Sequence, residues 1–195
     1  EDEERVAFLY IDGHVREYHG KFPLFQAKKA QRQVVTPAAT DTWVHDADGE
    51  PLLVVTSELN AKLTQVLEPI LADVRRLVGD QRRMTVIFDR GGFSPTLFAR
   101  LIDAGFDVVT YRKGKVKKLP STRFEAVKEK INGVWREYTI CDRPRVRVGR
   151  LPAEKTHRRK RGKAKKRYLW MREVRVLRDD GRQTPIFTNR QDLSA

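Results

Sequence analysis

The chain has 195 residues, of which 39% are hydrophobic, so it can bury a core and is not disordered throughout. Its formal net charge of +14 and pI near 10.2 favour a polyanionic partner. The single cysteine, Cys141, excludes an internal disulfide and a cysteine-based zinc site and indicates a reducing, cytoplasmic setting. No run approaches the roughly 18 apolar residues of a membrane-spanning helix, and we expect no membrane association.

The positive charge is unevenly distributed. Residues 1–111 contain 13 lysines and arginines against 17 aspartates and glutamates, whereas residues 112–195 contain 27 against 9. The first part therefore resembles an ordinary globular domain that carries carboxylates, and the second is where a phosphate backbone would be held. The acidic start at Glu1 leads almost directly into an apolar run, so we expect the chain to be part of a longer protein.

The first half of the chain predicts strands and then alternating helices and strands. The expected elements are a strand at 5–12 that turns at Gly13 into a hairpin partner at 14–18, a loop with a short helical piece at 20–33, and a hairpin of 42–46 and 51–57 around an Asp-Gly pair. Apolar residues at helical spacing predict a helix from Asn60 to about Val78. Ser94 is expected to cap a helix that Pro95 begins and Gly105 ends, and 84–88 and 106–111 are buried strands.

The second half has a different sequence pattern, in which arginine and valine alternate along short runs. Strands are expected at 115–119, 134–141, 144–150, 167–178 and 184–188, with a short helix at 121–131. Strands first and then alternating β and α elements indicate a mixed α/β sheet with helices on its faces, an order that is compatible with an RNase H-like fold.

Two apolar strands each end at an aspartate. Asp12 follows residues 6–11, and Asp89 follows residues 84–88. If these strands lie side by side, the two carboxylates converge and repel each other. A bound divalent cation commonly offsets such repulsion. Plain turn chemistry for Asp12 and capping by Asp89 are the alternative explanations, although Ser94 is better placed to cap.

A two-metal site for phosphodiester chemistry normally needs a third acid. Glu173 and the turn at Asp179-Asp180 are weak candidates for it. His14 and His19 are expected to be structural histidines rather than ligands.

Basic residues near the second acid and in the second half are the expected phosphate contacts. The run from Lys155 to Arg167 contains nine lysines and arginines and no acid, and we expect a flexible loop there that contacts phosphate without reading sequence. The candidate DNA-binding residues are Arg90, Arg112, Lys113, Arg158, Arg159, Lys160, Arg161, Lys163, Lys165 and Lys166. The interleaved aromatic residues Trp135, Tyr138, Tyr168 and Trp170 could stack on bases, but we expect them in the core.

Four segments resemble, in this order, motifs of the DDE transposases of bacterial insertion sequences, in particular the IS4-like group. They are Tyr10–His14, Phe88–Ser94, Gly105–Gly114 and Thr184–Asn189. The resemblance covers nearly the whole chain, and its second and third segments are the most specific.

The resemblance implies an RNase H-like core with a β-rich basic insertion. It further implies Mg²⁺ or Mn²⁺ as cofactor, double-stranded DNA of transposon ends and target as partner, a homodimer in the active complex, and work in the bacterial cytoplasm at the nucleoid. Asp12 matches the first catalytic acid and Asp89 the second. The implied division is 1–112 for the core, 113–179 for the insertion and 180–195 for the return toward the core.

The third acid of that family is a glutamate on a helix some tens of residues beyond the Thr-Asn motif, and this chain stops before it. We therefore expect a catalytic-core fragment that is inactive by itself. Two rival hypotheses remain: a basic nucleic-acid-binding protein without catalysis, and a phosphohydrolase with an aspartate nucleophile. The latter ranks last because it needs an acid two residues beyond Asp12, where His14 stands.

Overall fold

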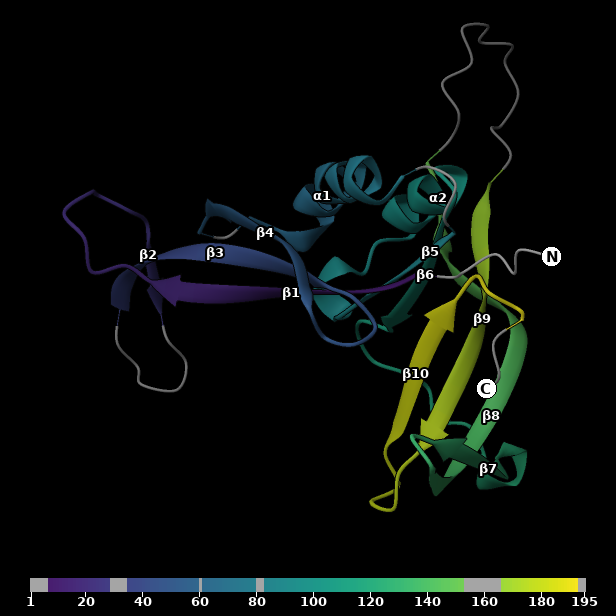
Figure 1. The fold of residues 1–195 in the computed structure, drawn as a ribbon. Coiled ribbons are helices and arrows are strands. Elements are labelled where there is room, and N and C mark those ends of the chain that lie inside the picture. Colours follow the sequence, from purple (N-terminus) through teal and green to yellow (C-terminus); the bar gives the residue numbers. More distant parts are fainter. Residues whose placement is uncertain (1–6, 29–34, 60, 80–82, 153–165, 193–195) are drawn as a thin grey trace, which may run out of the picture. The chain divides into compact units, whose positions relative to one another are not determined.

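The computed structural model describes residues 7–28, 35–59, 61–79, 83–152 and 166–192, which divide into two compact units, 1–92 and 93–195 (Figure 1). Unit 1 contains β1 (Ala7–Glu17), β2 (Gln26–Lys28), β3 (Val35–His45), β4 (Pro51–Glu58), α1 (Leu63–Val78), β5 (Met84–Phe88) and the 3₁₀ turn η1 (Arg90–Gly92). Unit 2 contains α2 (Pro95–Asp103), β6 (Phe106–Tyr111), the 3₁₀ turn η2 (Ser121–Arg123), β7 (Glu125–Ile131), β8 (Val134–Arg150), β9 (Tyr168–Leu177) and β10 (Gln183–Thr188).

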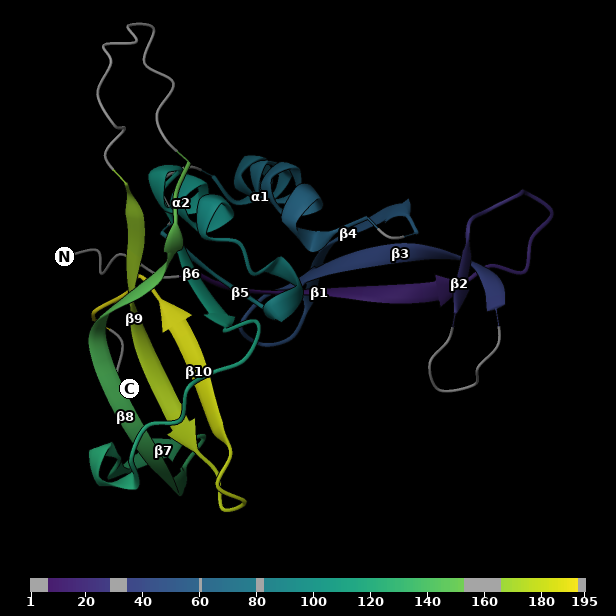
Figure 2. The ribbon, with the colours of Figure 1, turned by 180° about the vertical axis from the view of Figure 1, so that it is seen from behind.

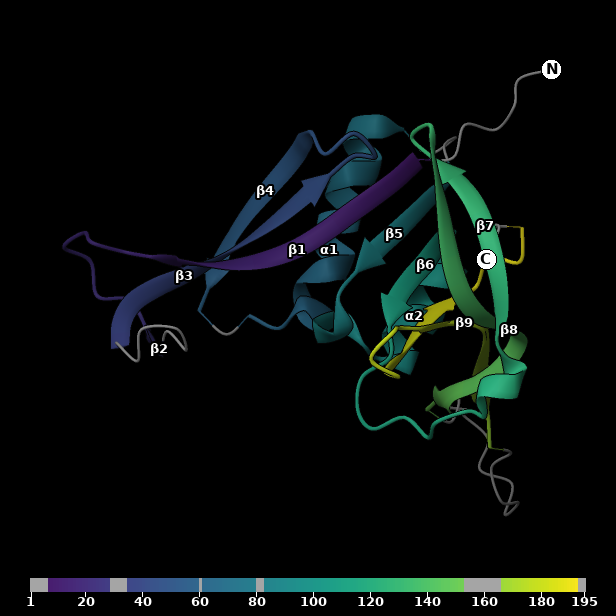
Figure 3. The same cartoon turned by 90° about the horizontal axis from the view of Figure 1, so that it is seen from below.

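Unit 1 is a mixed sheet with one long helix. β1 pairs antiparallel with β3 and parallel with β5, and β3 also pairs with β2 and β4. β1 and β5 can be followed side by side in Figure 3. Apolar residues of the strands and of α1 form its core, among them Leu9, Ile11, Val44, Leu67, Leu71, Val86 and Phe88. The buried strand residues just before Asp12 and Asp89 are therefore the part of the core that holds both acids in place.

Unit 2 is an antiparallel sheet in the order β6-β10-β9-β8-β7, and β8, β9 and β10 run side by side in Figure 2. The predicted start of α2 is confirmed: Ser94 Oγ accepts a hydrogen bond from Leu97 N at 3.3 Å, and Pro95 is the first helical residue. The predicted end is confirmed as well, since Gly105 follows the C-cap with φ of +81°. A glycine tolerates this left-handed conformation, which explains why the helix stops there.

The sequence-based expectations fail at several places. At three of them, strand pairing prevails over an expected turn or helix, and at 115–119 an expected strand does not form. Gly13 is not in a turn: β1 continues through it, and Gly13 pairs with Thr42 of β3. Residues 26–28 form β2 instead of a helical piece, and 29–34 lie outside the described residues. The helix expected at 121–131 is a 3₁₀ turn followed by β7, which pairs with β8 along its whole length.

Two strands expected on either side of residue 142 are one strand, β8, whose pairing with β9 shifts register between Arg143 and Val146. The hairpin around Gly49 is confirmed, and Gly49 has φ of +88°. Asn60, where the sequence predicts the first helix to begin, lies outside the described residues, and α1 begins at Leu63. None of the helices among the described residues is both long and apolar enough to cross a bilayer.

Candidate metal and nucleic-acid site

The strands that precede Asp12 and Asp89 are direct neighbours in unit 1. The parallel ladder of β1 and β5 matches Tyr10 with Ile87 and Ile11 with Phe88. Continued by one residue, the register sets Asp12 opposite Asp89, and neighbouring strands are about 4.8 Å apart. The expectation that these two strands lie side by side is confirmed.

Both aspartates are exposed, and each is fastened to a following glycine. Asp12 Oδ1 accepts a hydrogen bond from Gly13 N at 2.9 Å, and Asp89 Oδ1 accepts one from Gly91 N at 2.7 Å. A Cβ atom on Gly91 would lie 2.8 Å from Asp89 Oδ1, closer than such atoms approach. Only glycine at position 91 therefore leaves the Asp89 carboxylate where it is.

The donor chemistry of this pair fits a hard divalent cation. Mg²⁺ and Mn²⁺ prefer oxygen ligands, and Mg²⁺ is commonly held by one or two carboxylates while keeping several waters. Among the described residues, no group of three or more histidines, cysteines, aspartates and glutamates is placed to hold a metal ion. A cation held by this carboxylate pair would therefore take its remaining ligands from water and substrate.

Two of the weaker candidates for a third acid, Glu173 and Asp180, are engaged elsewhere. Glu173 is fully buried in unit 2 and bound by Arg175 and Arg143, so it is not open to a cation. Asp180 accepts hydrogen bonds from the backbone N–H of Arg182 in a turn, and its carboxylate also pairs with the Arg182 side chain at 3.2 Å.

The two histidines are placed along the arm formed by β1 and β3. His14 lies opposite Asp41 of β3. The hydrogen bond from Arg16 is the main cause that keeps the pKa of Asp41 below its usual value, and His14 makes a smaller contribution. His19 Nε2 lies 3.4 Å from Glu17 Oε2. Both contacts agree with structural roles.

The basic candidates are placed unequally. Arg90 is exposed in η1, directly after Asp89, and Lys113 and Lys166 are exposed in unit 2. Arg112 is partly buried, and its guanidinium lies over the Phe187 ring, 5.9 Å from the centroid. The other basic candidates lie outside the described residues: Arg158, Arg159, Lys160, Arg161, Lys163 and Lys165.

The expectation that Trp135, Tyr138, Tyr168 and Trp170 belong to the core is wrong, because both tryptophans are exposed and both tyrosines are only partly buried. Trp135 and Trp170 are 68% and 47% exposed. The Arg145 guanidinium lies over the Trp170 ring at 5.0 Å, and the Arg147 guanidinium lies over the Tyr168 ring at 4.9 Å. Such pairs fix arginines by cation–π attraction and leave the aromatic surface accessible. The alternation of arginine with aromatic residues was the sequence signal for this surface.

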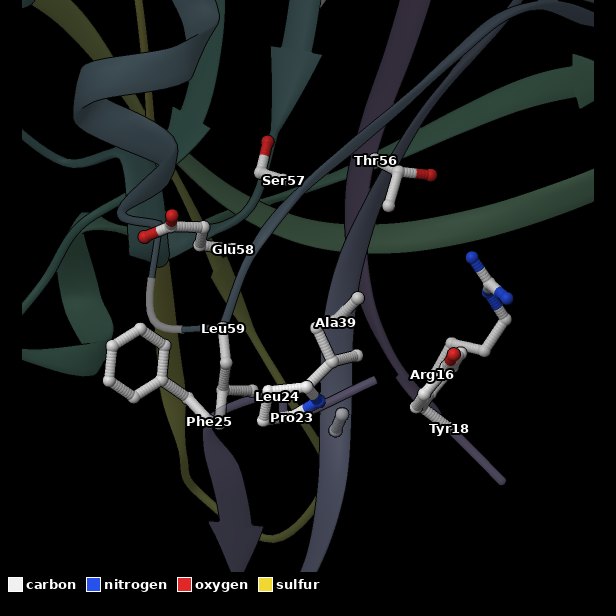
Figure 4. A pocket seen from close by; sticks show the side chains of 11 residues that line it. Arg16, Tyr18, Pro23, Leu24, Phe25, Ala39, Thr56, Ser57, Glu58 and Leu59 are labelled. Atoms are coloured by element: carbon white, nitrogen blue, oxygen red, sulfur yellow. The ribbon is translucent and has the colours of Figure 1, made fainter. Parts of the chain in front are cut away.

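Unit 1 also has a cavity of about 450 Å³ that contains none of the predicted site residues (Figure 4). It lies at the far end of β1 from Asp12, where Tyr18, Leu24 and Phe25 face β3 and the end of β4. Its lining is largely apolar and offers no cluster of acids. The carboxylate pair, not this cavity, is the candidate site for phosphodiester chemistry.

Comparison with known proteins finds a family match and a structural match. The family model described as "Transposase protein" matches residues 1–193. No curated protein matches the sequence significantly. Among solved structures, the chain is similar to the piggyBac transposase in a cryo-EM structure of its synaptic complex with hairpin DNA, with a TM-score of 0.51 and 10% sequence identity.

That similarity covers 96% of this chain and 34% of the piggyBac chain, so this chain spans about a third of that protein's length. At this level of identity the likeness shows the fold alone. The expected fold class, a mixed α/β chain with an RNase H-like core, is confirmed. The division at residues 112 and 179 stays a prediction.

Proposed function

Because the chain belongs to the Transposase protein family (Transposase_29), whose model spans residues 1–193, we propose that it is part of a DDE transposase that cleaves and joins DNA at transposon ends. The observation that carries this proposal is the parallel register of β1 and β5, which pairs the residues directly before Asp12 and Asp89 with each other. The four motifs that resemble the IS4-like group support a bacterial insertion sequence as its origin. We further propose that the protein acts as a homodimer at the nucleoid in the bacterial cytoplasm.

In this proposal Asp12 and Asp89 each donate a carboxylate oxygen to Mg²⁺ or Mn²⁺. A cation there would help to activate a water or a 3′-hydroxyl and would stabilise the leaving oxygen of a phosphodiester. The backbone N–H groups of Gly13 and Gly91 hold each Oδ1 in place, so both carboxylates are oriented before a cation arrives. Arg90, exposed beside Asp89, is placed to touch a phosphate of the bound strand.

Binding of Mn²⁺ to the 195-residue chain, followed by electron paramagnetic resonance, tests the metal site. Asp12→Asn and Asp89→Asn should each weaken binding by about tenfold or more, because each removes a charged ligand. Asp48→Asn is the matched control, since Asp48 is an exposed acid of the hairpin between β3 and β4. Equal Mn²⁺ affinity in all four proteins would contradict the proposal.

The same variants separate the proposal from a DNA-binding protein without catalysis. In that alternative the two aspartates are incidental, and the double variant Asp12→Ala/Asp89→Ala would leave every effect of Mg²⁺ on thermal stability unchanged. Under our proposal, Mg²⁺ raises the melting temperature of the wild-type chain by mass action and does not raise that of the double variant.

DNA affinity and its salt dependence test the second half of the chain. Neutralising phosphates releases counterions, so six or more contacts should lower affinity on the order of 10³-fold between low and moderate salt. Deletion of residues 155–167 should abolish most of this binding. An affinity that stays flat with salt would contradict a phosphate-binding role.

A two-metal site of this kind needs a third acid, and the described residues bring no third acid to this pair, so we expect the 195-residue chain not to cleave DNA. Incubation with Mn²⁺ and end-labelled DNA, read on a denaturing gel, checks this. Cleavage that depends on Asp12 would show that the missing ligand is already within the chain.

A further inference from the structure

The centre of unit 2 holds a buried carboxylate among three guanidinium groups. Glu173 in β9 has no exposed surface. Its Oε1 accepts hydrogen bonds from Arg175 Nη2 at 2.7 Å, Arg175 Nε at 3.0 Å and Arg143 Nη1 at 3.1 Å. Arg112 Nη1 lies 3.9 Å from Glu173 Oε2. One negative charge is thus surrounded by three positive ones.

The strand register brings these residues together from β8, from β9 and from the position directly after β6. Arg143 of β8 is paired with Glu173 of β9, and Glu173 is paired with Phe187 of β10. Residues directly opposite one another share a face of the sheet. Arg112 follows β6, its backbone N–H donates to Pro185 O at 3.1 Å, and its guanidinium lies over the Phe187 ring. Arg112 and Arg143 therefore approach Glu173 from opposite sides.

Arg175 is buried, and its hydrogen bonds join it to other residues of unit 2. It is 2% exposed, and besides Glu173 it donates to Lys117 O at 2.8 Å and to Gln183 Oε1 at 3.2 Å. This single arginine already neutralises the charge of Glu173. A buried ion pair needs no further cation, so Arg112 and Arg143 are a surplus of two positive charges.

The two surplus arginines keep unused donors at the surface. Their side chains are 32% and 34% exposed. Within the described part of the chain, Arg143 gives one side-chain hydrogen bond, to Glu173, and Arg112 approaches Glu173 Oε2 without bonding to it, so that oxygen has no hydrogen-bond partner. A guanidinium has five N–H donors, so most of them remain available for an external acceptor.

We propose that Arg112 and Arg143 form a phosphate-binding fork for the DNA backbone, and that Glu173 is the positioning residue that holds the two arginines in place. A guanidinium matches a phosphate with two parallel hydrogen bonds, which a flexible lysine does not. Arginines that are held before binding lose less side-chain freedom on contact with DNA. This inference rests on the proposed function only in taking DNA as the source of the phosphate.

Substitution of Glu173 distinguishes a positioning role from a simple effect of net charge, because the two predict opposite changes in DNA affinity. If only net charge mattered, removing the carboxylate would raise the positive potential and strengthen DNA binding. If Glu173 holds the fork, its loss frees both arginines and weakens DNA binding. Glu173→Asp keeps the charge and shortens the side chain by one methylene, so it tests the reach of the carboxylate with the net charge unchanged.

The experiment measures affinity of the 195-residue chain for a short duplex of random sequence at several salt concentrations. Arg112→Gln and Arg143→Gln should each reduce the slope of log K against log salt by about 0.9, the value for one phosphate contact. Arg136→Gln is the matched control, because Arg136 is an exposed arginine on the same strand as Arg143. Slopes for Arg112→Gln and Arg143→Gln no smaller than that of Arg136→Gln would overturn the fork.

Glu173→Asp should bind DNA more weakly than wild type, with a slope approaching that of the Arg112→Gln/Arg143→Gln double variant. Unchanged or tighter binding would overturn the positioning role. Arg143→Lys keeps its charge, and recovery of full affinity by it would also contradict a fork.

Inorganic phosphate, added at constant ionic strength and followed by NMR of the arginine side chains, distinguishes a free anion from DNA. Tight saturable binding of phosphate alone would overturn the assignment to DNA. If wild type itself fails to bind DNA, the proposed function falls together with this inference. If wild type binds DNA with a steep salt dependence and the fork variants behave like Arg136→Gln, only the inference falls.

Discussion

The two units use carboxylates in opposite ways. Unit 1 has 12 lysines and arginines against 15 aspartates and glutamates, and it exposes Asp12 within β1 and Asp89 directly after the neighbouring strand β5. Unit 2 has 28 against 11, and it buries Glu173 beneath arginines. Two exposed carboxylates repel each other and attract a cation. A buried carboxylate instead holds the cationic side chains around it in place. Location, more than residue type, therefore decides what a carboxylate does in this protein.

The buried acid should matter most for stability. Arg175→Met leaves Glu173 with only its partly exposed partners, and breaking a buried pair costs about 3–5 kcal/mol. We expect the lower end of that range, because Arg143 still bonds the carboxylate. Urea unfolding measures the effect, with exposed Arg178→Met as the control.

The double variant Glu173→Gln/Arg175→Met should recover much of this loss, since it removes both buried charges. A loss below about 1 kcal/mol for Arg175→Met, typical of a surface pair, would show that the interior of unit 2 does not depend on this ion pair.

The exposed pair of unit 1 should be sensitive to a single methyl group. Gly91→Ala sets a Cβ 2.8 Å from Asp89 Oδ1 and displaces the carboxylate from Gly91 N. Loss of such an orienting contact typically lowers metal affinity about 10- to 100-fold. Mn²⁺ titration checks this against Gly13→Ala, where the nearest atom, Thr40 Cγ2, is 4.0 Å away. Equal losses in both variants would exclude a specific role for Gly91.

The cap of α2 tests local structure in unit 2, where the sequence signal is strongest. Ser94→Ala removes the hydrogen bond to Leu97 N and should cost about 1 kcal/mol of unfolding free energy. Ser94→Gly should cost only a few tenths, because glycine is accepted at this position. Urea unfolding of both variants gives the comparison, and equal stability of Ser94→Ala and wild type would refute the cap.

The smallest effect is expected from the ion pair on the arm of unit 1. The Arg16 hydrogen bond, with help from Thr56, holds the pKa of Asp41 below its usual value, even though burial opposes this. A depressed carboxyl pKa contributes stability above the unfolded-state pKa of about 3.8, and that stability is lost as pH falls through the folded-state pKa. Solvent screens the exposed side of Arg16, which limits the gain.

Unfolding of wild type and Asp41→Asn at pH 3 and pH 6 measures this difference. The stabilities of the two proteins should converge at the lower pH and differ at the higher one. A difference that is constant over this range would assign the role of Asp41 to packing or neutral hydrogen bonds.

Patterns confined to one segment predicted structure well. Ser94-Pro95 and Gly105 bracket α2, and the Asp-Gly pair marks the hairpin between β3 and β4. Prediction failed where partners distant in sequence compete with a local preference. Gly13 favours a turn by itself, but pairing with Thr42 keeps β1 extended.

Residues 121–131 show the same competition. Their composition allows a helix, but pairing with β8 makes residues 125–131 form the strand β7 instead. Glu173 gives no sign in the sequence that it is buried, because its partners Arg143 and Arg112 are 30 and 61 positions away.

The amino-acid sequence alone determined the basic second half, the apolar runs that precede Asp12 and Asp89, and the resemblance to transposases. These are properties of composition and of short periodic segments, which need no knowledge of distant partners. Only the tertiary structure decided that β1 and β5 are neighbours, and that Arg112, Arg143 and Arg175 surround one buried carboxylate. Sheet pairing is a choice among distant segments, and its outcome depends on which pairing buries the most apolar surface and leaves the fewest charges unpaired.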